Sequence, residues 1–362
     1  MPPSLSKSQP RAEPQDLDPA RLRPSWVLSA LGVLVFSMLV GVMVGAVTID
    51  PVAIVLELID HIPGVDVDSG LSPTRAAIVW DIRFPRVVLG AMVGGMLATS
   101  GAAYQGVFRN PLADPYLLGI AAGAGLGATL VIVADVGDGV GFLDPIPLAA
   151  FAGAGLAVAL TLTVGGTVTG RGTAATLLLA GIAVAAFFTA LQTYVQSREV
   201  ERLREVYSWI LGRLSGASWD DVALLAPYMF LSVGVLFWSR RALDVLAVGE
   251  DEALTLGIDP VRLRWRIVLA ASLAAASAVA VSGLIGFVGI IVPHFVRLFV
   301  GTSNKVVIPI SFLIGGAFLV IADVIARTIQ SPAELPIGVV TAFFGAPFFL
   351  FVLRTRDAGV GV

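Results

Sequence analysis

Long apolar runs are the feature that most constrains what this chain can fold into. A helix needs about 20 mostly apolar residues to cross about 30 Å of hydrocarbon, and Trp26–Thr48 already has that length. Charged residues make up 14% of the 362 residues, against about 25% in soluble domains. Such a chain cannot cover its surface in water, which excludes a soluble enzyme, a nucleic-acid-binding protein and a disordered scaffold.

Runs of this kind predict an all-α polytopic membrane protein with ten transmembrane helices. Glycines and Pro293 interrupt the eighth run, which is therefore expected to be a short half-helix. Basic residues favour the loops that share a side with the N-terminus, and this distribution predicts both termini in the cytosol. The predicted spans are 26–48, 86–108, 115–134, 146–168, 175–196, 222–239, 264–284, 286–300, 306–327 and 336–354.

The predicted transmembrane domain extends over residues 26–356. Residues 1–25 contain six prolines and few apolar side chains, which is typical of a disordered tail on the cytosolic side. Residues 357–362 are expected to form a short C-terminal tail. No tandem or inverted repeat is evident in the sequence.

Glycines are spaced within several spans, for example at Gly94 and Gly101 in the second and Gly123 and Gly127 in the third. Small residues at such intervals let helices approach closely in lipid. We therefore expect these glycines to serve helix packing rather than ligand binding.

Two segments between spans are predicted to be helices that do not cross the membrane. Ser197–Asp221 has apolar residues at a spacing of three to four between charged ones, which predicts an amphipathic helix on the outer interface. Residues 249–258 predict a short cytosolic helix that begins with three acidic residues and ends at Gly257. Its Ala253, Leu254 and Leu256 are expected to be exposed and to form a docking surface. The alternative is a capped helix that lies on its own protein.

The chain lacks the residues of several chemistries. Neither Lys7 nor Lys305 has the glycines of a phosphate-binding loop, so the chain is not itself a Walker-type ATPase. Cysteine is absent, and His61 and His294 are too far apart for a helical zinc motif. We therefore predict no catalytic residue, no metal site and no cofactor bound by this chain.

Asp323 is the only acidic residue well inside a predicted span. Arg327 follows it by four residues, which is the spacing of a helical ion pair. Proton-coupled carriers usually have unpaired acids at this depth. Because Asp323 has an expected partner, an ion-coupled secondary transporter is the alternative function and not the preferred one.

Six segments, in order and at compatible spacing, carry a resemblance to a known family. Together they span residues 83–354, about three quarters of the chain, and resemble the membrane-spanning permease subunit of ABC importers for iron chelates (siderophores, haem) and vitamin B12. The segments are RFPRVVLGAMVGGMLATSGAAYQGVFRNPLADPYLLGIAAGAGLGA (83–128), LLLAGIA (177–183), WILGRLSGASWDDV (209–222), LAVGEDEALTLGID (246–259), VSGLIGFVGIIVPHFVRLFVG (281–301) and ADVIARTIQSPAELPIGVVTAFFGAPFFLFVLR (322–354).

This resemblance implies a type II ABC importer permease fold in the cytoplasmic (inner) membrane. The implied assembly contains a second permease copy, identical or closely related, around a central pathway. Two ATP-binding subunits would dock from the cytosol and hold ATP with magnesium, and an external substrate-binding protein would deliver the chelate. The expected function is import of vitamin B12, a ferric siderophore or haem.

The resemblance also assigns residues to the outer face. Arg83, Arg86 and Arg327 match external arginines that receive acidic residues of the binding protein. Planar guanidinium groups suit carboxylate recognition, and charges at an interface rim steer docking. In the alternative interpretation, Arg327 pairs with Asp323 and the other two arginines anchor in lipid headgroups.

On the cytosolic face, the resemblance implies an inner gate and a coupling helix. Asn110 and Leu112 match one gate element, although Asn110 could equally be a helix cap. Thr173 and Ala174 match the other element, where hydroxyl residues are expected at both positions, so Ala174 departs from the pattern. The segment expected to form the coupling helix against the ATPase contains Gly249, Glu250, Ala253, Leu254, Leu256 and Gly257.

Overall fold

The computed structural model describes residues 22–45, 47–62, 64–137, 139, 144–166 and 174–357. Most of the predicted tail at residues 1–25 and residues 358–362 of the predicted C-terminal tail lie outside this description. Within the described ranges, every element of regular secondary structure is a helix.

Ten apolar helices correspond in order to the ten predicted spans. Seven are long and apolar enough to cross a membrane, while the apolar stretches Ile120–Val133, Val288–Val300 and Ile337–Leu350 are shorter. The prediction of a short eighth helix is confirmed. The ten helices are α1 (Pro24–Met43), α4 (Phe84–Val107), α5 (Ile120–Val133), α6 (Pro145–Val164), α7 (Ala174–Arg198), α9 (Trp219–Val248), α11 (Pro260–Ser282), α12 (Val288–Val300), α13 (Asn304–Thr328) and α14 (Ile337–Asp357).

Short helices occupy the connections between these ten. α3 runs directly into the π-helical turn η1 and then into α4, so residues 73–107 form one continuous helical rod. The short elements are α2 (Pro51–Asp60), α3 (Pro73–Ala77), η1 (Ile78–Arg83), η2 (Pro115–Leu118), η5 (Val200–Arg202), α8 (Leu203–Ile210) and α10 (Glu250–Thr255).

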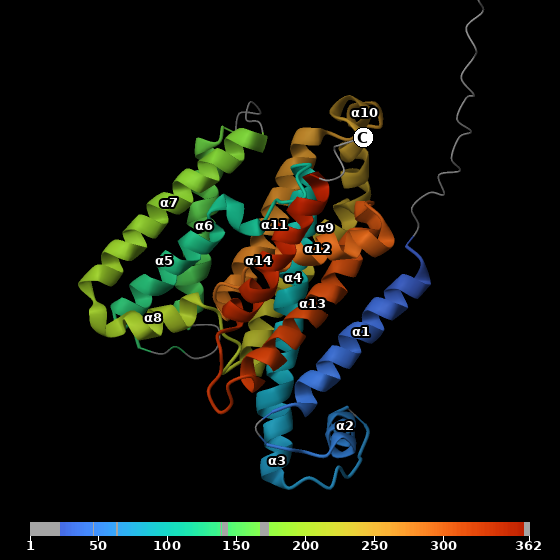
Figure 1. Cartoon of the computed structure of the whole chain (residues 1–362), viewed down its shortest axis with the longest axis vertical. Helices are drawn as coiled ribbons and strands as arrows, with labels where there is room; N and C mark the ends of the chain where they lie inside the picture. Colours follow the sequence, from blue (N-terminus) through green and yellow to red (C-terminus); the bar gives the residue numbers. More distant parts are fainter. Residues whose placement is uncertain are drawn as a thin grey trace, which may run out of the picture.

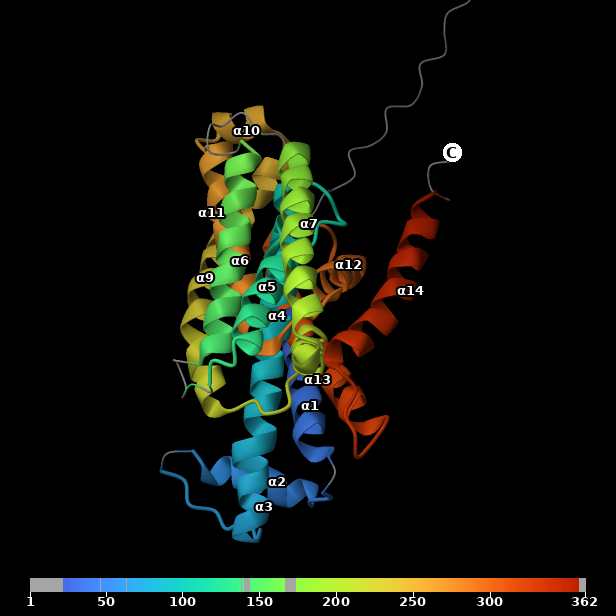
Figure 2. The same cartoon turned by 90° about the vertical axis from the view of Figure 1, so that its left-hand side faces the viewer.

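Helix α4 stands at the centre of the bundle (Figure 1) and packs against α9, α11, α12 and α13. Helix α1 lies along α13, and α5, α6 and α7 form a second group on the opposite side. Figure 2 shows α14 leaning away from the bundle. Helix α10 lies at one end and α2 with α3 at the other. The bias of basic residues places the α10 end in the cytosol, and we call the opposite end the outer end.

Glycines produce the closest helix contacts, as predicted. A Cβ added at Gly94 of α4 would come within 2.2 Å of the Gly315 carbonyl oxygen of α13. A Cβ at Gly123 of α5 would come equally close to the Gly153 carbonyl oxygen of α6. Because glycine has no side chain, the two backbones can touch at these positions. The helices thereby gain van der Waals contact with each other in the lipid.

The prediction of one amphipathic helix over Ser197–Asp221 is wrong. α7 continues to Arg198, η5 and α8 follow, and α9 begins at Trp219. The Ser218 side chain accepts from the Asp221 amide, and Asp221 accepts from the Ser218 amide in return. This capping box starts a new helix where the periodic pattern suggested a continuous one. Only α8 keeps the predicted amphipathic character, burying Val206 and Trp209.

Two further boundaries differ from the prediction. Helix α9 extends to Val248 rather than residue 239, so the polar segment before α11 contains little besides α10. The first outer loop contains α2, which the sequence analysis did not predict. Asp50 caps α2 by accepting from the amides of Val52 and Ala53, and Pro51 occupies its first turn.

Candidate functional sites

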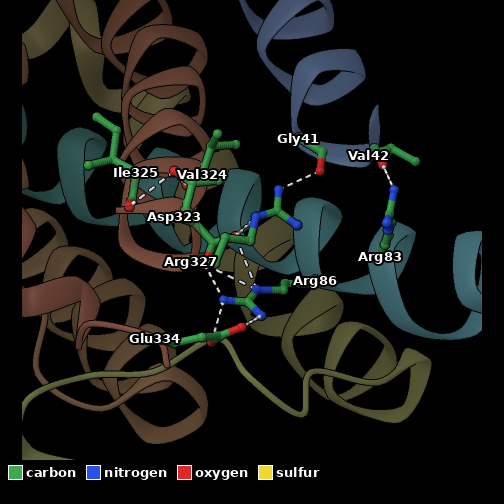
Figure 3. Close-up of polar contacts among 10 residues, drawn as sticks. Gly41, Val42, Arg83, Arg86, Asp323, Val324, Ile325, Arg327 and Glu334 are labelled. Carbon is green, nitrogen blue, oxygen red and sulfur yellow. Dashed lines mark hydrogen bonds and ion pairs between the residues drawn. The ribbon is translucent and has the colours of Figure 1, made fainter. Parts of the chain in front are cut away.

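Arg83 lies at the outer end of α4 and caps helix α1. Its side chain is buried, and Nη1 donates to the carbonyl oxygens of Val42 at 3.0 Å and Met43 at 3.2 Å, while Nη2 donates to Val47. The last carbonyls of a helix have no partner inside the helix and carry partial negative charge. Arg83 therefore satisfies the end of α1 with a positive charge (Figure 3).

Arg327 serves the same helix end from α13. Its Nη2 donates to the Gly41 carbonyl, and its Nε lies 3.5 Å from Asp323 Oδ2. The predicted ion pair between Asp323 and Arg327 is thus present.

Arg86 binds two carboxylates with its whole guanidinium group (Figure 3). Nε and Nη2 donate to Asp323 of α13 at 2.8–3.1 Å. Nη1 and Nη2 donate to Glu334 in the α13–α14 loop, both at 2.9 Å. The hydrogen bond from Arg86 lowers the pKa of Glu334 below its usual value. Such two-point pairs between guanidinium and carboxylate are the strongest polar contacts available to these side chains.

The three predicted docking arginines are therefore engaged inside the chain. The side chains of Arg86 and Arg327 are only 11% and 7% exposed, and Arg83 is buried as well. The alternative of headgroup anchoring by Arg83 and Arg86 does not fit this burial. Docking of an acidic partner at these arginines stays a prediction.

Sequence reasoning missed Glu334 as a member of this cluster. It lies 248 residues from Arg86 along the chain, in a polar loop with no helical spacing that could mark it. A cavity of about 90 Å³ opens beside the pair, and its lining includes Arg86, Asp323, Glu334, Arg213 and Ser215.

At the cytosolic end, α10 presents an apolar surface to solvent. Leu254 is 58% exposed and Leu256 is 67% exposed. The expectation that Ala253 is exposed is wrong, because α10 packs on α9 and α11 and buries this residue completely. One face of α10 thus lies on its own protein, as in the alternative interpretation, and another face is exposed. Docking of a partner at the exposed face stays a prediction.

Turns and charge fix the orientation of α10. Gly249 precedes the helix with extended backbone, and Gly257 follows it with a φ of +76°, a conformation that favours glycine. Glu250 in the first turn forms an ion pair with Arg264 of α11. These contacts hold Leu254 and Leu256 outward.

The predicted inner gate is only partly described. The Asn110 side chain accepts from the Leu112 amide at 3.0 Å, so it closes a local turn rather than capping a helix. Thr173 lies outside the described residues, and Ala174 is the first residue of α7. In the same turn, Asp114 accepts from the Tyr116 amide, and burial raises the pKa of Asp114 to about 6.

Comparison with known proteins identifies the family. Residues 33–355 match the family model described as the FecCD transport family. The chain belongs to the FecCD transport family. A FecCD relative from Halobacterium salinarum, the cobalamin import system permease protein BtuC, is 43% identical over 288 residues, which cover 80% of this chain and 76% of that protein.

Two further relatives are named for the import of other substrates. The Fe(3+)-citrate import system permease protein YfmE of Bacillus subtilis is 35% identical and covers 92% of this chain and 96% of its own length. The hemin transport system permease protein HmuU of Yersinia pestis is 39% identical, with coverage of 78% and 85%. A solved structure described as a metal-chelate type ABC transporter in an inward-facing conformation has a TM-score of 0.79 at 26% identity, covering 92% of this chain and all of that one.

Proposed function

We propose that this FecCD-family protein is the permease subunit of an ATP-driven importer that carries a metal chelate across the cytoplasmic membrane. The observation that carries the proposal is the family match over residues 33–355, together with relatives named for cobalamin, hemin and iron-citrate import. The cargo class is therefore vitamin B12, a ferric siderophore or haem.

The energy source belongs to a partner, since the sequence has no phosphate-binding loop of its own. The exposed leucines of α10 support docking of a nucleotide-hydrolysing subunit at the cytosolic end. Such apolar residues surrounded by acids match the apolar centre and polar rim of protein interfaces. Two ATP-binding subunits would hold ATP with magnesium and move α10 during their cycle.

The remaining partners are a second permease copy, identical or closely related, and an external binding protein. The binding protein is expected at the outer end, where the arginine cluster lies. Only weak contacts with the cargo are required inside the pathway, because tight binding would slow its release.

An ion-coupled secondary transporter is disfavoured by the contacts of Asp323. This buried acid accepts hydrogen bonds from Arg86 and pairs with Arg327. Asp323 is therefore not an unpaired acid of the kind that proton-coupled carriers place inside the membrane.

The proposal is tested by uptake into proteoliposomes. We expect uptake of cobalamin, a ferric siderophore or haem only when the permease is reconstituted with its ATPase, its binding protein and ATP. Uptake should continue in the presence of an uncoupler. Uptake by the permease alone, driven by an ion gradient, would show that the chain is a secondary transporter.

A further inference from the structure

The contact between Arg86 and Glu334 is the more exposed of the two carboxylate contacts of Arg86. Asp323 lies on rigid helix α13 with its side chain 4% exposed, and it holds the inner edge of the Arg86 guanidinium. Glu334 lies in the loop 329–336, its side chain is 39% exposed, and it holds the edge formed by Nη1 and Nη2. Glu334 can therefore be displaced from Arg86 more easily than Asp323.

Guanidinium groups from several elements lie around this contact. Arg83 and Arg327 donate hydrogen bonds to carbonyl groups at the end of α1. The Nε of Arg327 also lies 3.5 Å from Asp323 Oδ2. Arg213 lines the same cavity as Arg86 and Glu334, and its side chain is exposed. A carboxylate that takes the place of Glu334 therefore meets Arg86 and, in the same cavity, Arg213.

We propose that Glu334 is an internal substitute for an acidic side chain of the external binding protein. It fills the outer edge of Arg86 while the permease is free, and the partner's carboxylate replaces it on docking. Both carboxylates can make the same pair of hydrogen bonds to Nη1 and Nη2, so they compete for one place. The displaced Glu334 remains beside Arg213, which limits the cost of the exchange.

The exchange has a structural consequence for the α13–α14 loop. The Arg86 contact ties this loop to α4, and the loop leads directly into α14 at Ile337. Replacing Glu334 by the partner's carboxylate removes this tie. Docking at the outer end therefore loosens the loop around Glu334, while the backbone hydrogen bonds from Leu335 to Ala326 and from Ile337 to Gly212 still hold its end.

The inference rests on the proposed function, because it assumes a binding protein that docks at the outer end. The test measures binding of the purified cognate binding protein to the permease–ATPase complex in lipid nanodiscs. Glu334→Gln removes the competing charge while keeping the shape of the side chain. We expect it to tighten binding by about five-fold, the size of a partly exposed ion pair, and the gain should shrink at high salt.

The matched control is Glu205→Gln on α8. Glu205 is an exposed acid that pairs with Arg202 and does not line the cavity beside Arg86 and Glu334. This change should leave binding unaltered. In an Arg86→Lys background the gain from Glu334→Gln should disappear, because a lysine offers no two-point contact for the two carboxylates to share.

A second measurement follows the loop without any partner. The chain has no cysteine, so Ala333→Cys gives a single labelling site for a spin label. Glu334→Gln should raise the mobility of this label in the free permease. Unchanged or weaker binding by the Glu334→Gln variant would overturn the inference. If the wild-type complex neither binds the partner nor imports with ATP, the proposed function itself fails.

Discussion

At the scale of single residues, one arginine motif serves two purposes that sequence alone does not separate. Arg83 and Arg86 lie three residues apart in RFPR, yet Arg83 caps α1 and Arg86 clamps α13 and the α13–α14 loop. The π-helical turn η1 ends at Arg83, and Arg86 lies in the first turn of α4. Extra residues in a turn rotate the side chains that follow, which is why such turns often accompany functional sites.

The capping role of Arg83 gives the prediction at this scale. Arg83→Gln should lower the free energy of unfolding by about 2 kcal/mol, because charged hydrogen bonds to three carbonyl groups are lost in a buried place. Thermal unfolding of the purified permease measures the effect. Arg75→Gln is the control, since Arg75 is exposed on α3. Full stability together with lost capture of the binding protein would instead assign Arg83 to docking.

At the scale of elements, glycines decide which helices can touch. Gly153 and Gly155 lie on the same helix, α6, but meet different surroundings. A Cβ at Gly153 would lie 2.2 Å from the Gly123 carbonyl oxygen, whereas a Cβ at Gly155 would meet no atom within 4 Å. Close contact of α5 and α6 therefore depends on Gly153 and not on Gly155.

This difference predicts opposite effects of the same substitution. Gly153→Ala should lower the free energy of unfolding by about 2 kcal/mol, because the added methyl group forces two backbones apart. Gly155→Ala should be neutral or slightly stabilising, because alanine favours the helix. Thermal unfolding in detergent compares the two variants. Equal behaviour would mean that α5 and α6 do not pack as described.

The elements also show what a sequence can and cannot predict. All ten apolar helices were predictable from long apolar runs, and seven of them are long enough to cross the hydrocarbon layer. The capped starts of α2 and α9 were missed, since Asp50 and Ser218 act through local hydrogen bonds rather than through periodicity. Glu334 was unpredictable because its role depends on a contact with Arg86 across most of the chain.

At the scale of the whole molecule, the two membrane faces differ in chemistry. The outer end gathers arginines and acids into an internal network, while α10 at the cytosolic end exposes leucines. Burial of Ala253 could not be read from the pattern of α10, because a helix of six residues is too short for a clear period. The exposed Leu254 and Leu256 are therefore the residues here that a partner can contact.

Leu254 and Leu256 give the prediction at this scale. Replacing both with Asp should abolish copurification of the ATPase, because two charges would then be buried at an apolar interface. Membrane insertion should remain intact, since neither side chain is buried in the free chain. The control is Thr255→Asp, which adds a charge on the same helix. Unchanged copurification of the double variant would place the ATPase contact elsewhere.

Helix α9 connects these two faces without a break. Its 30 residues measure about 45 Å, more than the thickness of the hydrocarbon layer. Its first turn borders the outer cavity that contains Ser218 and Asp221, and its last residue is followed at once by Gly249 and α10. A tilt of α9 about a point inside the bilayer moves its two ends in opposite directions. A displacement of α10 in the cytosol is therefore coupled mechanically to a displacement beside the outer cavity.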